Sequence, residues 1–164
     1  MQGRNYRIAN GMPLCRKEYA RGSPQSKIAK FSTGKSSKDY EVKLQLMAKT
    51  RCQIRHNAIE AVRVSVNKRL GKLLIDEYRL QVKIYPHVIL RENRMIATAG
   101  ADRLQEGMRR AYGKPMGLGA RVIQGSVILE VSVKLDKVSI VKDALKRIVT
   151  KLPVETYVNE VLLN

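Results

Sequence analysis

The feature that most constrains the fold of this chain is a one-sided alternation of apolar and polar residues in several short segments. It is clearest over residues 127–134 and recurs over residues 40–46 and 79–84, while apolar runs over residues 87–90 and 154–164 indicate two shorter strands. Alternation predicts strands with one buried face, because successive side chains of a strand point to opposite faces. A parallel sheet covered on both faces would have continuously apolar strands. We therefore expect a mainly antiparallel sheet.

Two segments carry an apolar stripe at helical spacing. The first follows Asn57, a residue type that caps helices, and is expected to end at Gly71. The second follows Asp136, which would cap it, and ends at Pro153. Two amphipathic helices against a half-buried sheet predict an α+β fold, a two-layer sandwich of two helices on a mainly antiparallel sheet.

The charge balance indicates the class of partner. The 164 residues include 32 Lys and Arg against 14 Asp and Glu, so the formal net charge is +18. A charge of this size creates a long-range positive field, for which nucleic acid is the first candidate partner and an anionic membrane surface the second. The chain has no run of 18 apolar residues and no signal-like apolar core near its start. We therefore expect a cytoplasmic protein with no membrane partner.

The first 38 residues form a strongly basic segment without a sustained hydrophobic period. We interpret residues 1–38 as an arm that a nucleic-acid partner orders, and residues 39–164 as the α+β domain; a disordered, solvated tail is the alternative. Tyr6, Tyr19 and Phe31 could stack on bases or pack between RNA helices. The basic residues of this arm are Arg4, Arg7, Arg16, Lys17, Arg21, Lys27, Lys30, Lys35 and Lys38.

A second basic stretch, residues 98–121, combines five glycines with five basic residues. Glycine supplies backbone freedom without apolar surface, and each Lys or Arg needs water or a partner. We therefore expect a long exposed loop that projects from the domain and meets an anionic partner. A short surface helix over residues 101–112 is the alternative.

The same stretch does not meet the requirements of a nucleotide-binding P-loop. Five residues separate Gly107 from Gly113, where the P-loop pattern has four. Pro115 follows Lys114, where a Ser or Thr would bind magnesium. No phosphate-binding cofactor is therefore expected at this loop.

Catalytic and metal-binding chemistry is also not indicated. The two histidines, His56 and His87, are more typical of packing, capping or RNA-contact residues than of a general base, and no carboxylate pair stands out. Cys15 and Cys52 are interpreted as two reduced thiols, because they form no CxxC pair and match no structural zinc spacing. We expect no catalytic residue, no metal and no cofactor.

A family resemblance becomes visible in the loop. Residues 100–115 read GADRLQEGMRRAYGKP, which closely resembles the characteristic loop of the archaeal and eukaryotic ribosomal protein L ten e family, counterpart of bacterial L sixteen. The similarity extends to RGSP at residues 21–24 and EAVR at residues 60–63, and it runs in collinear order over roughly residues 4–152. The acidic last segment departs from this pattern. Taken together, the similarities and departures favour an archaeal protein.

The resemblance implies a structural, non-enzymatic protein of the large ribosomal subunit. Such a protein would bind large-subunit rRNA near the aminoacyl-tRNA site, contact neighbouring ribosomal proteins, and have a hammerhead-like sheet arrangement. Its loop would point toward the peptidyl transferase centre and the tRNA acceptor end through Arg103, Gly107, Arg109, Arg110, Gly113 and Lys114. Beyond the arm, the expected rRNA contacts are Arg63, Lys68, Arg91, Arg94 and Arg121, with Arg91 supporting the base of the loop.

Two other classes of function are compatible with the charge. The chain could be a basic RNA chaperone or a nucleic-acid-processing enzyme outside the ribosome, or a DNA-packaging module. The lack of a recognisable base or metal site argues against an enzyme. The localised loop and arm argue against packaging, which requires neither.

Overall fold

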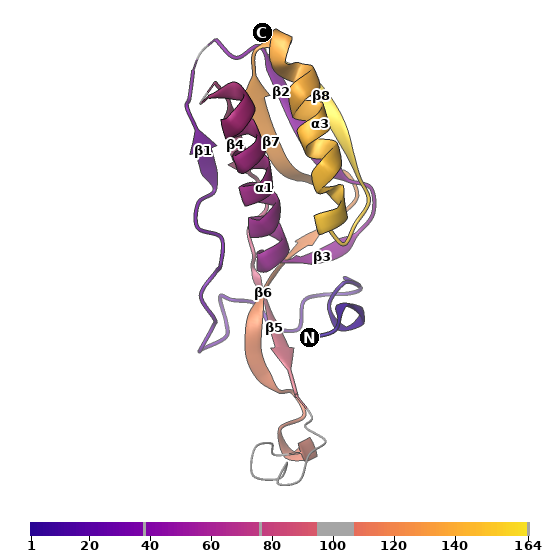
Figure 1. Ribbon diagram of the computed structural model, residues 1–164. Coiled ribbons are helices and arrows are strands. Elements are labelled where there is room, and N and C mark those ends of the chain that lie inside the picture. Colours follow the sequence, from indigo (N-terminus) through magenta and orange to yellow (C-terminus); the bar gives the residue numbers. More distant parts are fainter. Residues whose placement is uncertain (38, 76, 95–106, 164) are drawn as a thin grey trace.

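The computed structural model describes residues 1–37, 39–75, 77–94 and 107–163. Within these residues the chain forms an elongated α+β molecule built on two antiparallel sheets (Figure 1). The larger sheet has the strand order β1 (Ser32–Gly34), β4 (Arg79–Val82), β7 (Val127–Val133), β2 (Val42–Ala48) and β8 (Thr156–Leu162). The smaller sheet has the order β3 (Cys52–Arg55), β6 (Lys114–Val122) and β5 (Val88–Glu92).

The described helices lie side by side on one face of the larger sheet (Figure 1). They are α1 (His56–Leu74) and α3 (Val138–Ile148). The described residues also form four short 3-10 turns: η1 (Gly3–Asn5), η2 (Gly107–Arg110), η3 (Leu135–Lys137) and η4 (Val149–Lys151). The prediction of an α+β fold with two helices on an antiparallel sheet is confirmed, with the addition that the strands divide into two sheets.

The core lies between the helices and the larger sheet. Every second residue of β2 is buried, with Leu44 and Leu46 fully inaccessible to solvent, as the alternation predicts. The stripe of α1 packs against this face through Val66 and Leu70, and α3 adds Leu145. Burial of such side chains stabilises a fold by about 1.5 to 3 kcal/mol each, so this interface is the main source of stability.

The predicted helix boundaries differ from the observed ones. Arg55, in extended conformation, precedes the first turn of α1, so Asn57 lies inside the helix and no side chain caps it. Asp136 likewise lies inside η3, which leads directly into α3. Gly71 does not end α1, because the helix continues for one more turn to bury Leu74 against the core. Burial of Leu74 outweighs the cost of about 1 kcal/mol for glycine in a helix.

The smaller sheet was not predicted as a unit. Its central strand, β6, contains Gly117 and Gly119, which have low strand propensity. A Cβ atom at Gly119 would lie 3.2 Å from Cγ of Gln53 on the neighbouring β3. Glycine is therefore favoured here by close packing. This sheet extends away from the body of the molecule below the helices (Figure 1).

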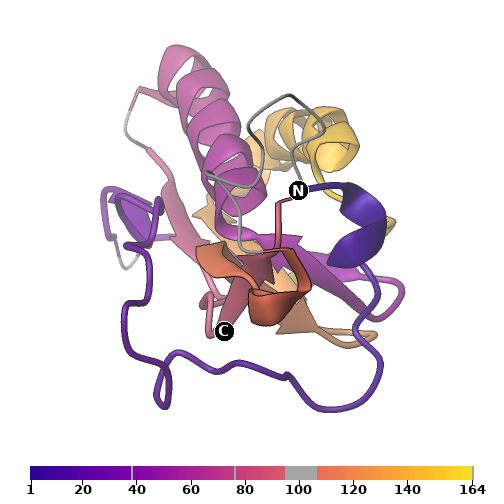
Figure 2. The ribbon, with the colours of Figure 1, turned by 90° about the horizontal axis from the view of Figure 1, so that it is seen from below.

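The basic arm is part of both sheets. β1 pairs with β4 at one edge of the larger sheet, and Arg16 forms an isolated bridge with Val88 of the smaller one. Viewed from below, the arm follows the outside of the smaller sheet (Figure 2). These contacts cross the boundary predicted between residues 1–38 and 39–164, so the arm is defined by its charge and is not a separately packed unit.

Candidate nucleic-acid interface

The projecting part of the molecule is a hairpin formed by β5 and β6. The two strands pair from Val88 opposite Gly119 to Glu92 opposite Lys114. The prediction of a loop over residues 98–121 is therefore wrong for residues 114–121, which belong to β6, because Gly-rich sequence can form a strand when its neighbours leave no room for side chains. Residues 98–106, including Arg103 and the first half of the alternative helix over residues 101–112, lie outside the described residues.

Arg91 holds in place the base of the loop that joins these two strands. Its Nε donates to the carbonyl oxygen of Tyr112 at 3.3 Å, and its terminal nitrogen donates to the carbonyl oxygen of Gly113. The guanidinium carbon also lies 4.5 Å from the centre of the Tyr112 ring, a cation–π contact. Gly113 has a φ of +72°, and a Cβ atom there would lie 2.3 Å from the backbone nitrogen of Asn93. The turn geometry is thus set by glycine and by Arg91.

The hairpin presents positive charge beyond this fixed base. Arg109 and Arg110 of η2 are exposed, as are Lys114 at the start of β6 and Arg94 after β5. Gly107 begins η2. The structure therefore brings the described members of the predicted loop set to one end of the molecule, where a polyanion could reach them.

Backbone hydrogen bonds hold the arm against the smaller sheet. Gln53 donates its backbone N–H to the carbonyl oxygen of Arg7 at 2.9 Å, and its Nε2 to that of Tyr6 at 3.0 Å. Ile89 donates to the carbonyl oxygen of Cys15 at 2.8 Å. These bonds engage the arm's backbone and do not use its basic side chains.

The arm's aromatic residues pack within the chain. Arg16 lies over the Tyr19 ring at 5.0 Å, and Phe31 stacks on Tyr85 with ring centres 5.8 Å apart. Tyr6 lies under the guanidinium of Arg55 at 5.4 Å. These rings therefore make contacts within the chain, and Tyr19 is 74% exposed.

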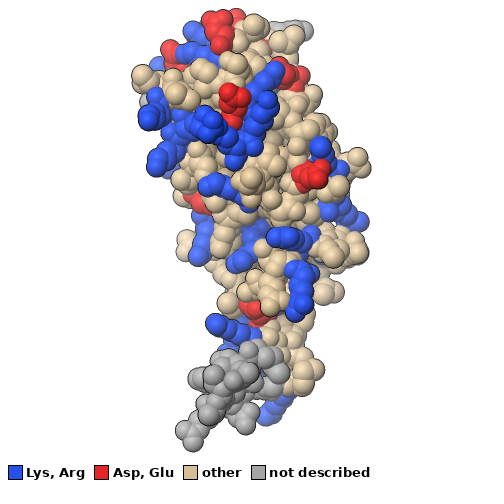
Figure 3. All heavy atoms as spheres, turned by 45° about the vertical axis from the view of Figure 1, so that its right-hand side comes forward, with Lys and Arg blue, Asp and Glu red and all other residues tan. Residues whose placement is uncertain are grey.

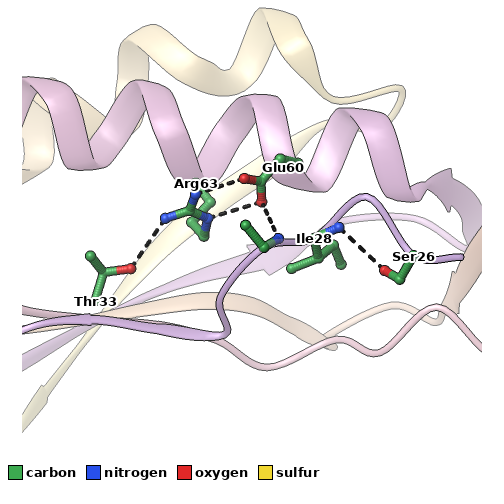
Figure 4. Close-up of polar contacts among 6 residues, drawn as sticks. Ser26, Ile28, Thr33, Glu60 and Arg63 are labelled. Atoms are coloured by element: carbon green, nitrogen blue, oxygen red, sulfur yellow. Dashed lines mark hydrogen bonds and ion pairs between the residues drawn. The ribbon is translucent and has the colours of Figure 1, made fainter.

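A cluster of polar contacts fixes the second half of the arm to α1 (Figure 4). Arg63 donates two hydrogen bonds to the carboxylate of Glu60, at 2.9 and 2.6 Å, and a third to Oγ1 of Thr33 at 3.3 Å. The backbone N–H of Ala29 donates to the same carboxylate at 3.4 Å, and that of Ile28 to Oγ of Ser26 at 3.2 Å. We call Glu60 and Arg63, with the arm residues they hold, the α1 clasp.

The α1 clasp changes the role expected of Arg63. This residue is 9% exposed, and its guanidinium is engaged within the chain, so we do not include it in the interface proposed below. The hydrogen bonds from Arg63 hold the pKa of the Glu60 carboxyl below its ordinary value, and Glu60 raises the pKa of Arg63. Both groups therefore stay charged at neutral pH.

His56 lies at the junction of the arm and the two sheets. It is 3% exposed, and its Nδ1 accepts the backbone N–H of Lys27 at 3.3 Å. Burial lowers the pKa of His56, and the nearby charges of Lys27 and Arg55 lower it further. The imidazole is therefore neutral at pH 7 and serves as a packing and hydrogen-bonding residue, in line with the interpretation from the sequence.

Arg121 is also partly engaged within the chain. It donates to the carbonyl oxygen of Gly11 at 2.6 Å and to Oε1 of Gln53 at 3.2 Å. Its side chain is half-buried, and burial lowers its pKa, with a further contribution from Arg51. Arg121 thus anchors the arm to the smaller sheet.

Most of the predicted arm cations are exposed, apart from Lys17, which is half-buried, and Lys38, which lies outside the described residues. The exposed ones are Arg4, Arg7, Arg16, Arg21, Lys27, Lys30 and Lys35. On the face shown in Figure 3, Lys and Arg are more frequent than Asp and Glu along the length of the molecule.

The helices carry further exposed cations. Lys68 was predicted from the sequence as an RNA contact, and four others were not. Lys72, Lys146, Arg147 and Lys151 are exposed on α1, α3 and η4. The available signal was the near absence of acidic residues from the polar face of each helix. Among the described helices, none is long and apolar enough to cross a membrane.

Comparison with known proteins identifies the family of this fold. A family model described as "Ribosomal protein L16p/L10e" matches residues 10–159. The chain belongs to this family. The resemblance seen in the loop and the arm is therefore confirmed over nearly the whole sequence.

Relatives within the L16p/L10e family match along most of their length. Three proteins named "Large ribosomal subunit protein uL16" illustrate this. The one from Staphylothermus marinus is 48% identical over 151 residues, covering 92% of this chain and 87% of that protein. Those from Hyperthermus butylicus and Sulfolobus acidocaldarius are 47% and 45% identical, covering 98% and 99% of this chain and 89% and 94% of their own lengths.

Proposed function

We propose that this chain is a structural, non-enzymatic component of the large ribosomal subunit that binds large-subunit rRNA. The observation that carries this proposal is the L16p/L10e match over residues 10–159, together with relatives named as large-subunit proteins that align over almost their full length. A net charge of +18 supplies the electrostatic attraction that RNA binding requires.

The arm and the hairpin are the proposed contact surfaces. The exposed arm cations project from a backbone that is already fixed to both sheets, so little ordering entropy is lost when they meet phosphates. Contacts of this kind position a protein on RNA by shape and charge and carry no base sequence information. Neighbouring ribosomal proteins are expected as further partners.

The β5–β6 hairpin is proposed to approach the peptidyl transferase centre and the tRNA acceptor end. Its support is geometric: a rigid two-strand base fixed by Arg91 extends from the body and carries Arg109, Arg110 and Lys114 at its far end. An element of this shape can reach into a space too narrow for the domain itself.

Sedimentation tests the ribosomal assignment. The tagged full chain, expressed in an archaeal host, is expected to sediment with large subunits at moderate salt. If it stays in the light fractions with free RNA or protein, the chain acts outside the ribosome, as an RNA chaperone or processing enzyme would.

A hairpin variant tests the finer assignment in the same particles. Replacing Arg109, Arg110 and Lys114 by Gln is expected to leave sedimentation intact and to weaken aminoacyl-tRNA binding by the purified subunits. A matched control replaces Lys43, Lys83 and Lys134, which lie on or beside the larger sheet. Equal tRNA binding by both variants would remove the hairpin from the tRNA site.

A further inference from the structure

A cavity of about 210 Å³ lies where the arm, the start of α1 and the segment after α3 meet. Three cations from three separate segments line it: Arg7 of the arm, Arg55 at the end of β3, and Lys151 of η4. Asn57 and Thr150 add polar side chains to its wall. The topology therefore gathers positive charge from distant parts of the sequence at one hollow.

The charge in this cavity is not neutralised by its own walls. None of the residues that line it is Asp or Glu. Nε of Arg55 is inaccessible to solvent and has no hydrogen-bond acceptor among the described residues. The Arg55 guanidinium rests on the Tyr6 ring, which fixes its position without satisfying its donors.

The backbone adds to the same preference. The first turn of α1 forms part of the cavity wall through Asn57 and Ala58, and no side chain caps this turn. The first turn also contains no acidic residue. Uncapped N–H groups at a helix start, together with Arg and Lys side chains, suit a tetrahedral oxyanion with several acceptor oxygens.

A second hollow lies beside this cavity along α1. Asn57 and Lys151 also line this second hollow, which reaches Lys27 of the arm. The carboxylate of Glu60 borders this second hollow, but it is already engaged by Arg63 and by the N–H of Ala29. A chain of phosphates could therefore pass from the cavity toward Lys27, as an RNA backbone would.

We propose that the cavity formed by Arg7, Arg55 and Lys151 binds one backbone phosphate of RNA and thereby fixes the register of the arm and helices on it. This inference rests on the proposed function for the identity of the RNA. The phosphate chemistry itself follows from the charges and donors of the cavity.

Titration with inorganic phosphate at constant ionic strength tests the site on the full chain. We expect saturable chemical-shift changes at the amides of Asn57 and Ala58 by NMR. The double variant Arg55→Gln, Lys151→Gln is expected to weaken the apparent affinity at least tenfold. Its matched control is Lys68→Gln, Lys72→Gln, which removes the same charge from the exposed face of α1. Non-saturable shifts, or equal weakening by both variants, would overturn the proposal.

An RNA titration distinguishes a backbone phosphate from free phosphate. The measurement is the slope of log affinity against log salt for a large-subunit rRNA fragment. In the Arg55, Lys151 variant the magnitude of this slope should fall by about 0.7 to 0.9, the value for one phosphate. An unchanged slope would overturn the assignment to RNA. If Arg55→Gln disturbs folding, the single variant Lys151→Gln is used for the measurement. Lys151 is exposed, so its replacement should leave the fold intact.

The two proposals fail in different ways. If the wild-type chain does not sediment with large subunits, the ribosomal function fails whatever the phosphate titration shows. If it sediments normally and the cavity variant changes neither phosphate nor RNA binding, only the cavity assignment fails.

Discussion

Arg63 joins two segments that are 30 residues apart in the sequence, since it contacts both Glu60 of its own helix and Thr33 of the arm. From the sequence, Arg63 belongs to a basic helix face and is an RNA-contact candidate. Its actual position follows from tertiary packing that places the arm over one side of α1, which no local pattern encodes. By contrast, the exposed state of Lys68 on the same helix is what the helical stripe predicts.

The α1 clasp predicts a pH dependence of stability that can be assigned to Glu60. Arg63 lowers the folded-state pKa of Glu60 below the ordinary value of 4.5. Its contribution is therefore present above about pH 4.5 and is lost as the pH falls through the lower folded-state pKa. Glu60→Gln is expected to reduce the free energy of unfolding by about 1 kcal/mol at pH 7, with a smaller difference from wild type near pH 3.

Urea unfolding at the two pH values measures this difference. The control Glu155→Gln removes a carboxylate that is 82% exposed and pairs with Lys49 at 3.5 Å, and it should have little effect at either pH. A Glu60→Gln difference that is equal at both pH values would show that the clasp acts through packing and not through charge.

The elements differ in how far local sequence determines them. β2, β7 and the two helices could be predicted because burial of one face imposes a period that is visible in each segment alone. β8 was also predicted, from its apolar residues. β6 could not be, because its glycines are explained only by the neighbouring β3 and β5, and β1 and β3 are too short to show a period.

Gly113 is expected to be indispensable for the hairpin. In Gly113→Ala, the added Cβ would meet the backbone of Glu92 and Asn93 at 2.3 Å, in addition to the cost of about 1 to 2 kcal/mol for a left-handed alanine. Amide hydrogen exchange should then accelerate in β5 and at the start of β6, while the larger sheet stays protected.

Gly125→Ala provides the matched control for this prediction. Gly125 has a φ of +79°, but a Cβ atom there would meet nothing within 4 Å. Gly125→Ala therefore has the cost of a left-handed alanine but no steric clash with the backbone. Equal exchange in the hairpin of both variants would show that the base of the hairpin tolerates the added methyl group.

At the scale of the whole molecule, positive charge is distributed over an elongated body with cations at the arm, the helices and the hairpin (Figure 3). The net charge and the nucleic-acid partner class follow from composition. Composition does not show which cations are available to bind RNA. That depends on whether a carboxylate or carbonyl lies within reach of each cation in the folded chain. Lys49, Lys83, Lys137 and Lys142 each pair with a glutamate.

The difference between exposed and carboxylate-paired cations predicts the salt dependence of RNA binding. Replacing the exposed arm residues Arg21, Lys27, Lys30 and Lys35 by Gln should lower the slope of log affinity against log salt by about 3 if each contacts one phosphate. The measurement is RNA binding by fluorescence anisotropy between low and moderate salt.

The paired lysines supply the control at equal total charge. The variant with Gln at positions 49, 83, 137 and 142 also loses four positive charges, yet it should change the slope less, since these ammonium groups already have carboxylate partners. Equal slopes in the two variants would mean that net charge alone governs binding and that the arm has no special place in the interface.

The strand order also determines when the protein can fold during its synthesis. β2 and β4 pair with β7 and not with each other, and β3 and β5 both pair with β6, so the central strand of each sheet is made after its neighbours. Apart from the three-residue ladder of β1 with β4 and the backbone contacts of β3 and β5 with the arm, the described strands made before residue 114 have no strand partner on the growing chain. Contacts of such long sequence separation form slowly. Both sheets therefore assemble only when the last third of the chain has emerged, with β8 closing the edge at the end.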